Sequence, residues 1–297
     1  MTAQDSARVT IPSLKARKKT GEKIVALTAY DYAVASIVDG AGVDILLVGD
    51  SLGMVLLGYE NTLPVTMEDM IHHTKPVARA ARRALVVGDM PFLSYHLSGE
   101  QALANAGRFI REGGAHAVKI EGASPRRLRL IETLVEADIP VLGHVGLTPQ
   151  SIHRLGGFKV QGATPESSGR ILREARDVER AGAFAVILEC IPAETAGLIT
   201  SRLTIPTIGI GAGPRCDGQI IVFHDLVGCH GGYLPKFVKP YADLHGIIAD
   251  AVGRYREDVR AGAFPGDEHA YHLKAAPAAS RKRNAGAAAS GRKSGKS

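Results

Sequence analysis

The sequence contains no tryptophan, and aromatic residues make up only 5% of its 297 positions. A core must therefore be built from aliphatic and small side chains, and glycine alone occurs 34 times. The hydrophobic content of 45% is enough to fill a sizeable core, which excludes a disordered chain. Such a composition is typical of α/β proteins, in which aliphatic strands pack against helices.

Cysteine is also scarce. The three cysteines are Cys190, Cys216 and Cys229; they lack C-x-x-C spacing and belong to a chain too long to depend on disulfides. No stretch approaches the roughly 18 uninterrupted apolar residues of a membrane span, and the first residues contain no apolar segment of a signal peptide. We therefore expect a cytoplasmic location and no membrane partner.

The positive charge is unevenly distributed. The whole chain has 36 Lys and Arg against 30 Asp and Glu, but six of these bases lie in residues 275–297, which contain no acid. The body is therefore neutral. We expect 274–297 to be a disordered basic tail, and not a nucleic-acid-binding segment, because no aromatic residue interleaves its charges. The first twenty residues are also basic, and we expect a solvated helix or arm there.

Short apolar runs alternate with longer stretches in which apolar residues recur at helical spacing. Runs without polar alternation indicate strands covered on both faces, hence parallel strands joined by crossover helices. Their number favours a closed (β/α)8 TIM barrel over an open doubly wound sheet, with residues 1–273 forming one barrel domain that has an N-terminal arm and a C-terminal helix. The eight runs are 24–29, 44–50, 85–90, 117–122, 140–146, 185–190, 206–213 and 220–228.

Polar residues stand where several of these runs end. In a (β/α)8 barrel the reactive groups lie at the C-terminal ends of the strands, so we expect these side chains to converge on one rim. They are Asp50, Ser51, Asp89, Lys119, Glu121, His144 and Glu189.

Clustered carboxylates repel one another, and a divalent cation relieves that repulsion. Ligands that are all oxygen favour Mg²⁺ or Mn²⁺ over Zn²⁺. We expect Asp50 and Asp89 to be direct ligands, each following a glycine that lets the backbone turn sharply. Glu121 shares a strand face with Lys119 and would bind the metal directly or through water. The alternative for each aspartate is a cap on the following helix.

Six strings carry a resemblance to a known family. They are VGDSLGMVLLGYENTLPVTMEDMIHHTKPVARA (48–80), GDMPF (88–92), VKIEG (118–122), GHVGLTPQ (143–150), ILECIP (187–192) and TIGIGAGPRCDGQIIVFHDLVG (207–228). In order and spacing they resemble ketopantoate hydroxymethyltransferases, also called 3-methyl-2-oxobutanoate hydroxymethyltransferases. The resemblance extends from about residue 8 to residue 273 and leaves out only the basic tail.

The resemblance implies a barrel of the pyruvate/phosphoenolpyruvate-binding type, assembled as a cytoplasmic homo-oligomer, commonly a decamer. It implies transfer of a hydroxymethyl group from 5,10-methylenetetrahydrofolate to 3-methyl-2-oxobutanoate, giving 2-dehydropantoate and tetrahydrofolate for pantothenate and coenzyme A synthesis. Its metal-binding acids correspond to Asp50, Asp89 and Glu121, holding one Mg²⁺ per subunit. Its substrate-contacting groups correspond to Ser51 and Lys119, and its catalytic base to Glu189.

The chemistry of these groups suggests a mechanism. An α-keto acid can chelate Mg²⁺ through a carboxylate and a keto oxygen, so Asp50 and Asp89 would also help to bind substrate. Glu189 would then remove the proton from C3, and the charge of the resulting enolate would be held by metal and Lys119.

Other roles stay open. Ser51 either binds the substrate carboxylate or caps a helix, and His144 either contacts the keto acid or is structural. Tyr30 and His96 lie on strand-end loops with a weaker case. Two other functions compete: a keto-acid barrel that cleaves or rearranges carbon bonds, whose cysteine-bearing loop we do not find, and a non-catalytic scaffold whose tail binds nucleic acid.

Overall fold

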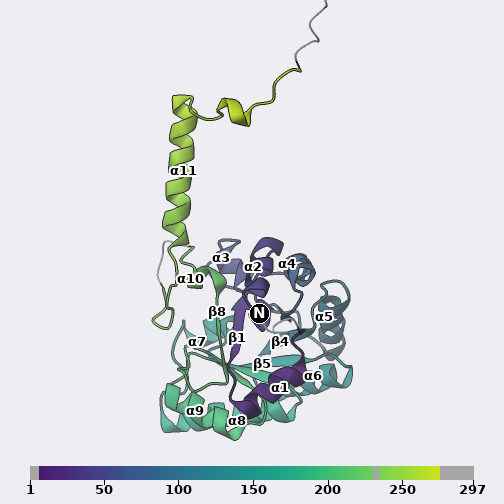
Figure 1. The fold of residues 1–297 in the computed structure, drawn as a ribbon. Coiled ribbons are helices and arrows are strands. Elements are labelled where there is room, and N and C mark those ends of the chain that lie inside the picture. Colours follow the sequence, from purple (N-terminus) through teal and green to yellow (C-terminus); the bar gives the residue numbers. More distant parts are fainter. Residues whose placement is uncertain (1–6, 230–233, 275–297) are drawn as a thin grey trace, which may run out of the picture. The chain divides into compact units, whose positions relative to one another are not determined.

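The computed structural model describes residues 7–229 and 234–274. Parallel strands form a closed barrel in the order β1 to β8, each hydrogen-bonded to the next and β8 to β1 (Figure 1). The (β/α)8 prediction is confirmed, and the open sheet is excluded. The strands are β1 (Ile24–Thr28), β2 (Ile45–Val48), β3 (Leu85–Asp89), β4 (Ala117–Glu121), β5 (Val141–Gly146), β6 (Ala185–Glu189), β7 (Thr207–Ile210) and β8 (Gly218–Ile221).

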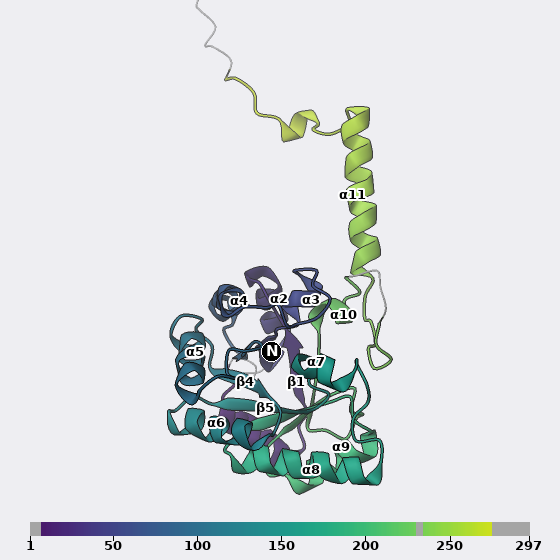
Figure 2. The ribbon, with the colours of Figure 1, turned by 180° about the vertical axis from the view of Figure 1, so that it is seen from behind.

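Helices follow most of the strands and lie outside them; Figure 2 shows α5, α6 and α8 around β4 and β5. Many begin at a hydroxyl cap: Thr66 before α4 and Thr164 before α8 each accept a hydrogen bond from the third helical N–H. The helices are α1 (Ile11–Thr20), α2 (Tyr32–Gly40), α3 (Leu52–Val55), α4 (Met67–Ala80), α5 (Gly99–Arg111), α6 (Pro125–Glu136), α7 (Ile152–Leu155), α8 (Pro165–Arg180), α9 (Ala193–Arg202), α10 (Phe223–Leu226) and α11 (Leu244–Ala261), with 3₁₀ turns η2 (Pro149–Ser151) and η3 (Asp267–His269).

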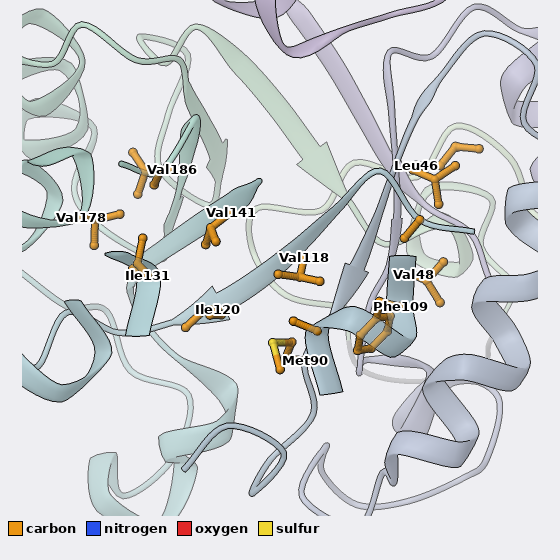
Figure 3. Close-up of a cluster of buried hydrophobic side chains, with 14 of the residues drawn as sticks. Leu46, Val48, Met90, Phe109, Val118, Ile120, Ile131, Val141, Val178 and Val186 are labelled. Carbon is orange, nitrogen blue, oxygen red and sulfur yellow. The ribbon is translucent and has the colours of Figure 1, made fainter. Parts of the chain in front are cut away.

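The strands are apolar on both faces because both faces are covered. One set of alternate side chains, such as Val118, Val141 and Val186, packs outward against the helices, where Phe109 of α5 and Val178 of α8 contact them (Figure 3). The other set fills the barrel interior as a separate cluster. This alternation fixes which strand residues can point into the barrel mouth.

Glycines next to the candidate site permit close packing. A Cβ on Gly88 would collide with the ring of Phe109, and one on Gly143 would collide with Val178. A Cβ on Gly49 would lie 2.8 Å from Ser51 Oγ. The chain does turn at Gly49, whose carbonyl accepts the N–H of Leu52 at 3.1 Å, but neither Gly49 nor Gly88 has a positive φ. These glycines are required by near neighbours, not by backbone conformation.

The N-terminal segment is more than a solvated arm. Leu14 of α1 is completely buried in the interior cluster of the barrel. Arg17 pairs with buried Asp44 at 2.6 Å, and Lys18 pairs with Asp217 at 2.7 Å. Asp44 and Asp217 precede β2 and β8, so α1 lies across the N-terminal end of the barrel. The basic residues of this segment suggested a helix exposed to solvent, but Arg17 and Lys18 instead form ion pairs with acids of the barrel.

The last strand is displaced from its predicted position. The run 220–228 was expected to be a strand, but β8 spans Gly218–Ile221 and α10 follows. A Cβ at Gly218 would lie 2.5 Å from the carbonyl oxygen of Ile24, so glycine allows β8 to pair closely with β1. Thr28 Oγ1 then accepts the N–H of Phe223 at 3.0 Å, which helps to turn the chain into α10.

The chain divides into two compact units, residues 1–247 and 248–297. The second contains most of α11, together with η3. Within it the rings of Tyr255 and Phe264 lie 5.5 Å apart. Across the described residues, no helix has the length and apolarity to span a membrane. The predicted basic tail lies outside the described residues from 275 onward.

Candidate active site

The inward-facing rows of four neighbouring strands end in polar side chains. On β3, Leu85 and Val87 of the interior cluster lead to Asp89, and on β4 Ala117 leads to Lys119 and Glu121. The parallel register pairs Asp89 with Lys119 and Glu121 with His144. Continuing the same alternation brings Glu189 of β6 to this end of the barrel. The predicted shared face of Lys119 and Glu121 is therefore present.

Lys119 is the cation at the centre of this group. Its Nζ lies 2.7 Å from Asp89 Oδ2 and 3.4 Å from Glu121 Oε1, and all three side chains are buried. Burial by itself would lower the pKa of Lys119, but the carboxylates of Asp89, Glu121 and Asp50 outweigh it and hold that pKa well above its ordinary value. The site therefore contains a buried ammonium group.

Glu121 is ionised in the same network. Burial opposes its charge, yet Lys119 and His144 lower its pKa to about 2. Its Oε2 also accepts the backbone N–H of Gln150 at 3.1 Å. Both carboxylate oxygens of Glu121 thus have a partner in the protein.

Asp50 and Asp89 lie side by side with less compensation. The backbone N–H of Asp50 donates to Asp89 Oδ2 at 3.3 Å. Burial raises the pKa of both, and the charge of Asp89 raises that of Asp50 further. Asp89 Oδ1 is buried without a hydrogen-bond partner among the described residues. Neither aspartate caps a helix, since Ser51 precedes α3 and Ser98 caps α5, so the capping alternative is wrong.

His144 connects this network to Glu189. Its Nε2 lies 3.2 Å from Glu189 Oε2, and its Nδ1 lies 3.6 Å from Glu121 Oε1, although neither nitrogen is aligned for a hydrogen bond. Burial would lower the pKa of His144, but the two glutamates overcome this effect and raise it to about 9. The imidazolium is thus poised between two carboxylates. The Glu189 side chain keeps 16% of its surface exposed, which leaves it within reach of a substrate.

Ser51 is held by Tyr30, whose place on a strand-end loop was only a weak indication of a role in the site. Its Oγ lies 2.8 Å from the hydroxyl of buried Tyr30, and it makes no capping hydrogen bond to α3. The capping role considered for Ser51 is therefore wrong, and Tyr30 belongs to the site as its partner. His96 instead contacts the rings of Phe92 and Tyr95, with centroids 5.0 and 4.4 Å away, and forms no ion pair with an acid in the part of the chain that the structure describes.

Gln150 joins the candidate site, although no feature of the sequence pattern pointed to it. Its side-chain amide donates to Asp50 Oδ2 and to the carbonyl of Met90, both at 2.9 Å, and its Oε1 accepts the hydroxyl of Tyr95 at 2.7 Å. With the backbone bond to Glu121, this buried residue joins two of the predicted metal ligands. The available signal was its position at the end of GHVGLTPQ.

A divalent cation fits part of the predicted ligand set. Over residues 7–229 and 234–274, no three His, Cys, Asp or Glu side chains are already arranged to hold a metal. Asp50 and Asp89 nevertheless provide adjacent carboxylates with raised pKa values and one unpartnered buried oxygen, which suit a hard cation such as Mg²⁺. Glu121, with both oxygens engaged, fits the water-mediated alternative better than direct ligation.

The closed parallel barrel is similar in fold to solved structures of the phosphoenolpyruvate mutase/isocitrate lyase superfamily. The 2,3-dimethylmalate lyase of that superfamily aligns with a TM-score of 0.57 and 17% identity over 85% of this chain and 88% of its own. Phosphoenolpyruvate phosphomutase from Streptomyces platensis subsp. rosaceus aligns with a TM-score of 0.56 and 16% identity over the same shares of the two chains, 85% and 88%. Identities this low show the fold alone.

The chain belongs to the ketopantoate hydroxymethyltransferase family, whose model matches residues 8–267. A relative from Syntrophomonas wolfei, named 3-methyl-2-oxobutanoate hydroxymethyltransferase, is 54% identical over 90% of this chain and 97% of its own. A relative of the same name from Geotalea uraniireducens is 57% identical over 89% of this chain and 98% of its own. The family resemblance expected from the sequence strings is confirmed.

Proposed function

We propose that this protein is a 3-methyl-2-oxobutanoate hydroxymethyltransferase, as its relatives are named. The substrates would be 3-methyl-2-oxobutanoate and 5,10-methylenetetrahydrofolate, and the products 2-dehydropantoate and tetrahydrofolate. One observation carries the proposal: a chain of close charged groups runs from Asp89 through Lys119, Glu121 and His144 to Glu189 at the C-terminal end of the barrel. It provides cations and a carboxylate base around one space.

Asp50 and Asp89 are the residues that would hold Mg²⁺. When bound, the ion would orient the keto acid and withdraw electron density from its carbonyl group. Gln150 restrains Asp50 through a 2.9 Å hydrogen bond, and Lys119 restrains Asp89 through a 2.7 Å ion pair. Ser51, fixed by Tyr30, offers a hydroxyl for the substrate carboxylate.

Glu189 is the base that removes the proton from C3 of the keto acid. The imidazolium of His144, with Nε2 3.2 Å from Glu189 Oε2, helps to position the carboxyl group of Glu189 at the barrel mouth. The ammonium of Lys119 faces the negative charge that develops on the keto oxygen. The methylene carbon forms a bond to C3 and a bond to the hydroxyl oxygen supplied by water, and its two bonds to the folate nitrogens break. The two nitrogens take up the proton removed from C3 and one proton of the water, which gives tetrahydrofolate.

Exchange of the C3 hydrogen in deuterated water tests this assignment. Wild-type protein with Mg²⁺ and the keto acid should exchange the hydrogen, and Glu189→Gln should bind the keto acid but exchange it at least about 100-fold more slowly, the usual contribution of a general base. Glu112→Gln, an exposed change beyond the end of α5, is the matched control. Undiminished exchange in Glu189→Gln would assign the base elsewhere, and full turnover in EDTA would remove the metal from the proposal.

The homo-oligomer, decameric or otherwise, and the cytoplasmic location stay predictions.

A further inference from the structure

The buried side chain of Tyr95 is connected to a candidate metal ligand by two hydrogen bonds. Tyr95 lies in the segment between β3 and α5, and its hydroxyl donates to Gln150 Oε1 at 2.7 Å. The side-chain amide of Gln150 in turn donates to Asp50 Oδ2 at 2.9 Å. Asp50 follows β2, and Gln150 belongs to η2 after β5. The two hydrogen bonds therefore join three separate connections at the C-terminal end of the barrel.

The Tyr95 hydroxyl determines which way the amide of Gln150 points. A glutamine side chain has one acceptor oxygen and one NH₂ group with two donors. Both donors are used, on Asp50 Oδ2 and on the carbonyl oxygen of Met90, and an ionised carboxylate and a carbonyl only accept. The oxygen of the amide then needs a donor, and within the described residues the hydroxyl of Tyr95 supplies it. Without this hydroxyl the amide could turn away from Asp50 to find another partner.

Tyr95 is well suited to act as a fixed donor. Burial raises the pKa of its phenol well above the ordinary value, and the charge of Glu121 adds to this effect, so the hydroxyl keeps its proton. The guanidinium of half-buried Arg127 lies 4.6 Å from the centroid of the Tyr95 ring, and the ring of His96 lies 4.4 Å away. The ring is thus restrained by packing as well as by its hydrogen bond.

We propose that Tyr95 is a positioning residue that acts through Gln150 on Asp50 and so raises the affinity of the site for Mg²⁺. The inference rests on the proposed function, in which Asp50 and Asp89 hold the ion. Within residues 7–229 and 234–274, Gln150 is the one side chain that hydrogen-bonds the carboxylate of Asp50. Loss of a hydrogen-bond partner of a metal ligand weakens metal binding about 10- to 100-fold. Because Tyr95 acts one hydrogen bond further from the ion, the lower end of this range is expected.

Calorimetric titration of the substrate-free protein with Mg²⁺ tests this inference. Tyr95→Phe removes only the hydroxyl, and its Kd for Mg²⁺ should be about tenfold higher than that of wild type. The Mg²⁺ concentration for half-maximal turnover should rise by a similar factor, and this rise should exceed any fall in kcat at saturating Mg²⁺. A residue that only supported folding would lower the unfolding midpoint and leave the Kd unchanged. Tyr255→Phe removes a hydroxyl from an exposed ring of the second unit and should bind Mg²⁺ as wild type does.

A double-mutant cycle shows whether the effect passes through Gln150. Gln150→Leu should itself raise the Kd for Mg²⁺, and adding Tyr95→Phe to it should raise the Kd by less than about twofold more. Gln150→Met, which keeps the length of the side chain, replaces Gln150→Leu in the cycle if the latter is too unstable. If the two changes instead raise the Kd independently, so that their effects multiply, the route through Gln150 is overturned.

The same measurements separate this inference from the function on which it rests. Absence of turnover in wild type, with weaker Mg²⁺ binding in Tyr95→Phe, overturns the proposed function alone. Normal turnover in wild type, with equal Mg²⁺ affinities in Tyr95→Phe and wild type, overturns only the role of Tyr95. Wild-type protein that binds no Mg²⁺ overturns this inference together with the metal part of the proposed function.

Discussion

Replacing Gln150 with leucine tests whether the site depends on its hydrogen-bond network. Leucine has a similar volume but no polar atoms, so Gln150→Leu removes the partners of Asp50 Oδ2, the Met90 carbonyl and the Tyr95 hydroxyl in one step. The backbone N–H that binds Glu121 is retained. The change is therefore confined to three buried contacts of one side chain.

The expected loss of stability is large. Each buried polar group left without a partner costs about 1–3 kcal/mol, so three such groups predict a decrease of at least about 3 kcal/mol in the free energy of unfolding. Because whole domains are stable by about 5–15 kcal/mol, this decrease is readily measured by urea unfolding at a common m-value. Turnover should fall as well, since Asp50 loses the donor that orients it.

Gln219→Leu is the matched control for this experiment. Gln219 is exposed on β8 and donates a single hydrogen bond of 3.0 Å, to the carbonyl of Gly213. Its loss should cost no more than about 1 kcal/mol. If Gln150→Leu unfolds at the same urea concentration as Gln219→Leu, the three groups have other partners and the reasoning fails.

Three further predictions concern packing, pH and metal. Leu14→Ala should lower the free energy of unfolding by about 2–5 kcal/mol and exposed Lys15→Ala should not; equal values would contradict the packing of α1. Burial, with a contribution from Arg127, lowers the pKa of His96 from 6.5 to about 4, so the unfolded chain binds a proton that the folded chain does not. The contribution of neutral His96 to the free energy of unfolding should be complete above pH 6.5 and should decrease as the pH falls toward 4. In His96→Gln this pH dependence should be lost, and urea unfolding that shows the same pH dependence as wild type would refute the prediction. Asp89→Asn should weaken Mg²⁺ binding in calorimetry, and an unchanged affinity would remove Asp89 from the ligands.

The sequence was sufficient to predict the barrel because uninterrupted aliphatic runs that alternate with helical stretches indicate parallel strands covered on both faces, and eight such strands favour a closed barrel. It was also sufficient to place Asp89, Lys119, Glu121 and Glu189 together, since strand alternation and parallel register determine which side chains share a rim. The error at β8 arose from the run 220–228, in which aliphatic residues continue past the point where Thr28 helps to turn the chain.

Gln150 and α1 were missed for a different reason. A neutral amide in a loop carries no charge or periodicity, and its four hydrogen bonds depend on residues distant in the sequence. α1 contains one fully buried residue, Leu14, amid basic ones, too weak a pattern to indicate packing. Both roles exist only once the strands have closed.

The glycines at 88 and 143 have a practical consequence for redesign. Each lies under a helical side chain that occupies the space of a Cβ, so any other residue would push α5 or α8 away from its strand. Directed-evolution libraries aimed at new acceptor specificity should leave both codons fixed. Diversity introduced there would mainly produce misassembled clones, and it would displace the neighbouring Asp89 or His144 before any change in specificity could be selected.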